Sequence, residues 1–352
     1  MKKRILVIIL LAVVVVSCLA LTACTHTHLY VNGKCFCGEL KPSTGLEYFL
    51  SIDGDSYSVV GRGSCRDLNI VIPSTYQGKP VTSICDEAFK YADITSITLP
   101  TYLTNIGDSA FAYCMGLTSI SLPDGVTSIG KNAFEQCIKL ESITIPNTVI
   151  SIGAYAFQSC KLKSVTIPSG VTSICDSTFA SCASLTSITL PSTVNSIENK
   201  AFALCSSLTD ITLPSSVTNI GEFAFYGCSS LTSITIPNSA IGLGAFSGCS
   251  GLVSVTISQG VTSIGNYVFS SCSSLTNITI PSSVTSIDAW AFQICTSLTS
   301  VIFEDTNGWR CTNTITNNDL PTDAIELTLT DPSQNAKYLT DTYWSYDWRK
   351  DN

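Results

Sequence analysis

The residues best suited to chemistry stand near the N-terminus, where the only two histidines of the chain accompany a pair of cysteines. His26 and His28 are followed closely by Cys35 and Cys37. Imidazole and thiolate groups bind zinc, and four of them complete a tetrahedral site. The Cys-x-Cys spacing departs from the Cys-x-x-Cys of zinc knuckles, so a disulfide and unpaired tether residues remain as alternatives. Zinc is the only cofactor that the sequence brings into consideration.

The rest of the chain lacks the residue combinations that catalysis requires. Both histidines precede the repeated body described below, so no Ser–His or Cys–His pair can form within that body. There is no phosphate-binding glycine loop, and no close pair of acidic residues recurs that would suit glycoside hydrolysis. The sequence therefore predicts a protein that is not an enzyme.

Cys24 follows a segment typical of export signals. Three basic residues at positions 2–4 precede the apolar run 5–16, which is too short to span a membrane. The sequence Leu-Thr-Ala-Cys at 21–24 resembles the lipobox of bacterial lipoproteins. The resemblance implies that residues 1–23 are removed as a signal peptide and that Cys24 carries the lipid anchor. We therefore expect an extracytoplasmic protein on a bacterial cell surface, in contact with the membrane through its N-terminal lipid only.

The charge balance narrows the class of partner. The whole chain has a net charge of −8, and loss of the three basic residues of the signal leaves 15 Lys and Arg against 26 Asp and Glu, a net of −11. Nucleic acid binding requires basic patches, so we expect no nucleic acid partner.

Internal repetition dominates the body of the chain. The pair Ala-Phe, or a close variant, recurs ten times at intervals of 21 to 23 residues. Each unit begins with Leu-x-x-Ile-x-Ile, which predicts a strand with one buried face, and continues with Pro and a second extended stretch, Val-x-x-Ile-Gly. The following Ala-Phe-x-x-Cys predicts a short helical turn. No unit of this length can bury its own apolar face, so the units must stack into a solenoid.

These motifs closely resemble the BspA-like subclass of leucine-rich repeats, which occurs on bacterial and some protist surfaces. The resemblance covers residues 65–303 and implies a β-rich solenoid, a leucine-rich-repeat type right-handed coil with short helical turns. It also implies adhesion or binding to host proteins, other cells or matrix. We expect an extracellular protein or glycan as the partner and no cofactor. A structural spacer or surface-coat component that binds nothing is the alternative.

Nine of the 17 cysteines lie three residues after a repeat phenylalanine. In stacked coils they would form a ladder with parallel Cβ vectors, which holds neighbouring Cβ atoms farther apart than a disulfide requires. We therefore expect buried thiols that act as small apolar groups. The ladder consists of Cys114, Cys137, Cys160, Cys182, Cys205, Cys228, Cys249, Cys272 and Cys295.

The outward positions of the first strand are almost all Ser or Thr, which predicts a flat hydroxyl face with very little charge. Specific recognition usually depends on distinctive side chains, so departures from the repeat consensus are the candidate ligand-binding residues. They are Asp210, Asn277, Lys163, Glu141, Trp290, Trp309 and Trp344.

The repeats also set the domain boundaries. We expect a signal peptide over 1–23, a tether over 24–44, a capping hairpin over 45–64, ten repeats of roughly 23 residues over 65–303, and an aromatic cap over 304–352. Asp331 followed by Pro332 predicts the start of a helix in that cap. The aromatic side chains there either cover the last coil or form a binding patch, for example for glycan.

Overall fold

The computed structural model describes residues 30–31, 33–35, 39–313 and 325–351. Contacts divide the chain into two units, residues 1–41 and 42–352. In the first unit, β1 (Tyr30–Val31) and β2 (Lys34–Cys35) pair antiparallel. The second unit is the solenoid with its two capping segments.

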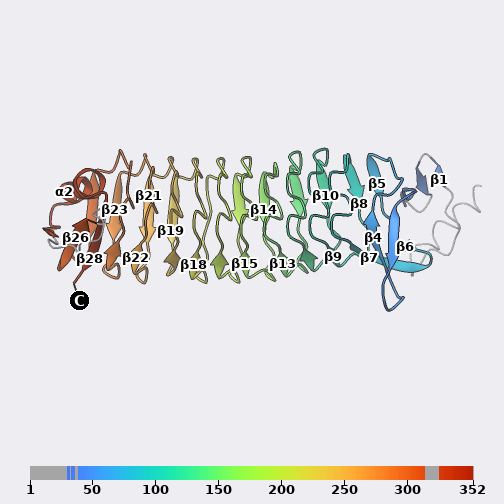
Figure 1. Cartoon of the computed structure of the whole chain (residues 1–352), viewed down its shortest axis with the longest axis horizontal. Coiled ribbons are helices and arrows are strands. Elements are labelled where there is room, and N and C mark those ends of the chain that lie inside the picture. The colour runs from blue at the N-terminus through green and yellow to red at the C-terminus, as the bar shows by residue number, and fades with distance from the viewer. Residues whose placement is uncertain (1–29, 32, 36–38, 314–324, 352) are drawn as a thin grey trace, which may run out of the picture. The chain divides into compact units, whose positions relative to one another are not determined.

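The second unit is a β-solenoid of about 11 turns, in which successive turns add short strands to two rows (Figure 1). The first row contains β5 (Asn69–Val71), β8 (Ser96–Thr98), β10 (Ser119–Ser121), β12 (Ser142–Thr144), β14 (Ser164–Thr166), β16 (Ser187–Thr189), β19 (Ser233–Ile236), β21 (Ser254–Ile257), β23 (Asn277–Ile280) and β25 (Ser300–Phe303). The second row contains β7 (Lys79–Ile84), β9 (Asn105–Ile106), β11 (Ser128–Ile129), β13 (Ser151–Ile152), β15 (Ser173–Ile174), β17 (Ser196–Ile197), β18 (Asn219–Ile220), β20 (Ala240–Ile241), β22 (Ser263–Ile264) and β24 (Ser286–Ile287).

The strands that pair within each row are parallel, and their register follows the sequence repeat. In the first row Ile120 lies opposite Ile143, and in the second row Ile129 lies opposite Ile152. Apolar side chains of equivalent positions therefore stack on one another inside the coil. The ten repeat phenylalanines form one continuous column, with ring centroids of neighbours 5.2 to 5.8 Å apart. This column and the flanking Ile, Leu and Val side chains form the core.

The segment around the repeat phenylalanine is a run of three overlapping β-turns, so the expected short helical turn was wrong. In the second coil Ala110 N–H donates to Gly107 O, Ala112 N–H to Ser109 O and Cys114 N–H to Phe111 O, each closing a four-residue turn. The intervening N–H group of Phe111 donates to Ala133 O of the next coil. Because such N–H groups bond between coils, they cannot form the i→i−4 bonds of a helix. Ser109, third in the first turn, has a φ of 55°, which likewise departs from helical geometry.

At Gly130 the close approach of adjacent coils leaves no room for a side chain. A Cβ built on Gly130 would lie 2.5 Å from the carbonyl carbon of Gly107 and 2.6 Å from the backbone nitrogen of Asp108. Real Cβ atoms do not approach backbone atoms so closely. The glycine of Ser-Ile-Gly at 128–130 therefore allows one coil to pack tightly on the next.

The N-terminal end of the solenoid carries a hairpin. β3 (Glu47–Leu50) pairs antiparallel with β4 (Tyr57–Gly61), and β4 runs parallel to β7, which begins with an antiparallel contact to β6 (Thr75–Tyr76). The rings of Tyr48 and Tyr76 stack at 3.9 Å, and Tyr57 meets Tyr76 edge-on at 5.0 Å. This end of the core is thus covered by tyrosine.

The C-terminal end is closed by three strands and a short helical segment. β26 (Trp309–Asn313) pairs antiparallel with β27 (Ile325–Glu326) and β28 (Tyr346–Lys350), and β28 pairs antiparallel with β24. The helix α2 (Pro332–Lys337) starts as predicted, with the Asp331 side chain accepting from two backbone N–H groups, and continues into the π-helix η1 (Tyr338–Thr342).

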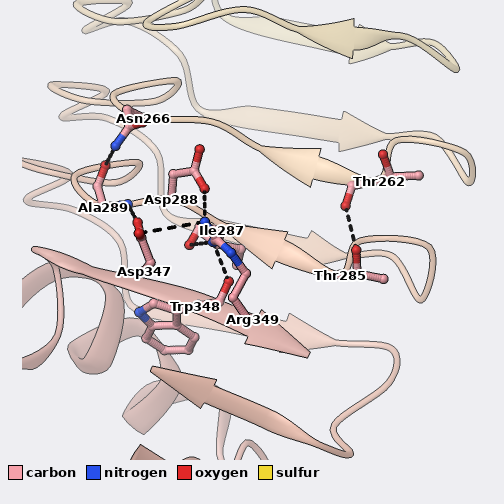
Figure 2. A network of polar contacts seen from close by, with 9 residues as sticks. All are labelled: Thr262, Asn266, Thr285, Ile287, Asp288, Ala289, Asp347, Trp348 and Arg349. Atoms are coloured by element: carbon pink, nitrogen blue, oxygen red, sulfur yellow. Dashed lines mark hydrogen bonds and ion pairs between the residues drawn. The ribbon is translucent and has the colours of Figure 1, made fainter. Parts of the chain in front are cut away.

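Polar contacts fasten this cap to the last second-row strand (Figure 2). The Arg349 guanidinium lies 2.9 Å from the Asp288 carboxylate, and Ala289 N–H donates to Asp347 Oδ1. The cap thereby pairs backbone groups that a further coil would otherwise take up. In the described part of the chain, no helix combines the length and apolar character that a membrane span needs.

Candidate binding surfaces

The outward side chains of the first row form the expected hydroxyl face. Ser119 and Ser121 are exposed on either side of the buried Ile120, and the same alternation recurs in the other first-row strands. The face offers hydroxyl groups that both donate and accept hydrogen bonds, but it lacks the aromatic and Arg anchors that dominate most interfaces.

Asp210 and Asn277 interrupt this face at equivalent positions three coils apart. Asp210 is exposed and makes an isolated bridge to Ser187, and its carboxylate has no hydrogen bond or ion pair within the described residues. The Asn277 amide donates to the neighbouring Thr276 hydroxyl at 3.0 Å. Asp210 lines a cavity, which is described below.

Lys163 and Glu141 form an ion pair that also includes Lys161, which the sequence reasoning did not select. Both lysine Nζ atoms lie 2.8 Å from Glu141 carboxylate oxygens. Hydrogen bonds from Lys161 and then Lys163 lower the pKa of Glu141 to about 2. The three side chains largely neutralise one another, which leaves one net positive charge at this exposed site.

The three candidate tryptophans lie in different environments. Trp290 is half-buried and stacks on Tyr267 with a centroid distance of 5.2 Å, and its backbone N–H donates to the carbonyl of the half-buried Trp344. Trp309 is only 1% exposed, packs edge-on against Phe303, and donates its indole N–H to Asp305 O. Trp309 is therefore part of the cap, and its selection as a ligand-binding residue was wrong.

The structure reveals an exposed apolar patch that the sequence reasoning missed. It consists of Tyr91, Tyr113, Met115 and Ile138, which lie on the turn segments of three adjacent coils. Tyr91, Met115 and Ile138 are 68%, 49% and 44% exposed. The two tyrosine rings stack at 4.8 Å. We call these four residues the turn patch.

Charged groups surround the turn patch. Lys90 pairs with Glu87 and lies 5.7 Å from the centroid of the Tyr91 ring, while the Tyr113 hydroxyl donates to Glu135 at 3.4 Å. An exposed apolar patch with a charged rim is typical of a protein interaction site. Alignment of the coils on their phenylalanines could have found it, because most other coils have Ser, Gly, Gln, Ala or Lys at the same positions.

The nine ladder thiols lie inside the core, adjacent to the phenylalanine column. Each donates to the carbonyl of a repeat phenylalanine, as Cys205 does to Phe179 O at 3.1 Å, and none is in a disulfide. Burial raises the pKa of Cys114 to about 12 and raises that of the other eight as well. A thiol with so high a pKa is protonated and unreactive at neutral pH. The ladder thiols therefore serve as packing groups of the core.

Most of the predicted lipidation and zinc-binding residues lie outside the residues that the structure describes. Cys24, His26, His28 and Cys37 lie outside the described residues. Cys35 is buried in β2. Among the residues that are described, no three His, Cys, Asp or Glu side chains gather as metal ligands. The choice between zinc, a disulfide and unpaired residues in the tether stays a prediction.

The family of the chain follows from the repeats now described. A family model for the BspA type leucine rich repeat region matches six copies across residues 82–322, which is more than half of the chain. The chain therefore belongs to the BspA-type leucine-rich repeat family. No curated protein shows significant similarity to it.

Solved structures to which this chain is similar come from several bacteria. A leucine-rich repeat protein of Bacteroides ovatus is 30% identical, with 73% of this chain and 86% of that chain covered and a TM-score of 0.46. A leucine rich cell surface protein of Faecalibacterium prausnitzii is 27% identical, with 75% and 94% covered and a TM-score of 0.48.

Proposed function

We propose that this protein is a lipid-anchored adhesin of a bacterial cell surface, which binds an extracellular protein or glycan without turnover and without a cofactor. Proteins of the BspA-type family are generally binding or scaffold proteins, and the similar F. prausnitzii protein is a cell surface protein. The signal-like segment and the Leu-Thr-Ala-Cys sequence at 21–24 support export and lipidation of Cys24.

The turn patch is the observation that carries the binding role. Tyr and Met are enriched at protein interfaces, and the patch presents the exposed Tyr91, Met115 and Ile138 beside the half-buried Tyr113 on a rigid backbone. The rigidity arises because N–H groups beside these side chains bond to the next coil, as Tyr91 N–H does to Ala112 O. A partner therefore meets side chains that are already ordered, which lowers the entropy cost of binding.

The binding role is tested with the purified full chain and a panel of immobilised extracellular matrix proteins and glycans. We expect saturable binding to at least one member, with Tyr91→Ser or Met115→Ser each weakening it by about tenfold. Leu204→Ser and Ile294→Ser are matched controls, because they remove exposed apolar side chains from the equivalent turn position of distant coils. A panel without any saturable partner, or equal losses in patch and control variants, would favour the spacer or surface-coat alternative.

The anchor is tested separately. A cell that expresses the chain and is fed a labelled fatty acid should incorporate the label into the wild type and not into Cys24→Ala. The variant should also leave the membrane fraction, because lipid is its proposed sole attachment. Equal labelling of both proteins would refute Cys24 as the lipidation site.

A further inference from the structure

Among the coils from β5 to β25, the coil that contains Asp210 contributes no strand to the first row. Residues 211–213 form no strand, and Asp210 makes only the isolated bridge to Ser187, although the coils before and after contribute β16 and β19. The interruption coincides with the most distinctive residue of the row. Asp210 is the only charged side chain among the outward positions from Ser96 to Thr279.

A cavity of about 240 Å³ opens between the two coils at this point. One side is formed by Ser187, Ile188, Thr189 and Leu190, and the other by Asp210, Ile211, Thr212 and Pro214. We call it the Asp210 notch. The two isoleucine side chains are buried below it, so the groups available to a ligand are one carboxylate, three hydroxyls and the half-buried Leu190 and Pro214.

The Asp210 carboxylate is available for a ligand. It accepts only, through two oxygens, and has no hydrogen-bond donor or cation among the described residues. The hydroxyls of Ser187, Thr189 and Thr212 can each donate or accept. A ligand that matches this set presents adjacent hydroxyl donors to the carboxylate and further oxygens to the hydroxyls.

The apolar groups and the size of the notch restrict the ligand further. Leu190 and Pro214 provide a small apolar surface that suits the C–H face of a ring. The volume lies below the roughly 300–1,000 Å³ of pockets for drug-sized ligands, which corresponds to one ring and not to an oligosaccharide. A calcium ion requires about six to eight oxygen ligands, more than a single carboxylate with hydroxyls supplies.

We propose that the Asp210 notch binds a single pyranose ring of a surface glycan, with two adjacent sugar hydroxyls donating to the Asp210 carboxylate and the C–H face of the ring on Leu190 and Pro214. This inference rests on the proposed binding function but uses a different face from the turn patch. The affinity of one ring is expected to be weak, with a Kd on the order of 1 mM. Repetition of the ring along a polysaccharide and of the protein over a cell surface would raise the avidity.

The test uses the full chain and a set of methyl pyranosides of glucose, galactose, mannose and N-acetylglucosamine, observed by saturation-transfer NMR. At least one should receive saturation and show a fitted Kd. Asp210→Ser restores the residue of neighbouring coils and should weaken that binding by about tenfold or more, because hydrogen bonds to a charged acceptor are the strong ones. Asp210→Asn keeps the shape without the charge and should also weaken it.

Asn277→Ser is the matched control, since it makes an equivalent change at a position that lines none of the described cavities. It should bind the sugar like the wild type. Absence of saturation transfer to every pyranoside, equal binding by Asp210→Ser, or binding of calcium ion in place of the sugar would each overturn the proposal. Tyr91→Ser should keep the sugar binding and Asp210→Ser should keep binding to a protein partner, so failure of the notch and failure of the turn patch are distinguished.

Discussion

Alkaline pH should unfold the solenoid cooperatively, because the thiol ladder stays protonated only while it is buried. In the folded chain burial holds the ladder pKa values above the ordinary 9.0, at about 12 for Cys114, Cys182, Cys228 and Cys295. The unfolded chain releases these protons as the pH passes 9.0. The unfolded state then binds fewer protons than the folded state, so the free energy of unfolding falls as pH rises.

The size of the effect follows from the number of thiols. The stabilisation is complete well below pH 9 and is lost as the pH rises toward the folded pKa values. At about pH 10 each thiol lowers the free energy of unfolding by about 1.4 kcal/mol, and the nine together by about 13 kcal/mol. A typical domain is stable by only about 5–15 kcal/mol. The solenoid should therefore unfold at about pH 10.

The assay is denaturant unfolding followed by circular dichroism, at a series of pH values with a reductant present. Replacing Cys182, Cys205 and Cys228 by Ala removes three of the nine ladder thiols and should reduce the contribution of the ladder to the alkaline slope by about a third. The triple variant starts less stable at neutral pH because of the small cavities. The control is a triple variant in which Ala replaces Ser164, Ser233 and Ser254. It should keep the wild-type slope. An unchanged slope in the cysteine variant would refute the reasoning.

Further predictions concern packing and backbone conformation, and all are checked by denaturant unfolding. Phe179→Ala should cost about 3–5 kcal/mol, because the ring is fully buried between two stacked neighbours at 5.5 and 5.7 Å. Gly130→Ala should destabilise by about 3 kcal/mol or more through its backbone clash, whereas Gly265→Ala, whose added Cβ meets nothing closer than 3.7 Å, should stay within about 1 kcal/mol of wild type. Ser271→Gly should stabilise by about 0.5–1 kcal/mol, because Ser271 has a φ of 61° and glycine adopts that conformation without a steric penalty; a loss of stability would show that strain is absent.

The comparison of sequence and structure is clearest in the turn segments. The spacing of Ala-Phe-x-x-Cys correctly placed a large ring and a small thiol inside the coil, because the period of 21 to 23 residues returns each position to the same environment. The spacing did not reveal that alternate N–H groups bond to the next coil, and so a helical turn was predicted where β-turns occur. The sequence pattern indicates which side chains are buried. It does not indicate which backbone groups of the next coil accept hydrogen bonds.

The sequence alone determined the repeat, its family, the two strand rows, the buried thiols and the helix start at Asp331, since each depends on periodicity or on neighbours along the chain. Only the tertiary structure decided that Trp309 is buried in the cap, that the Tyr91 and Tyr113 rings of the turn patch stack across two coils and that a cavity opens beside Asp210. These features depend on contacts between residues about 22 positions apart or more. Their distances are set by how one coil packs on the next, which a single repeat does not encode.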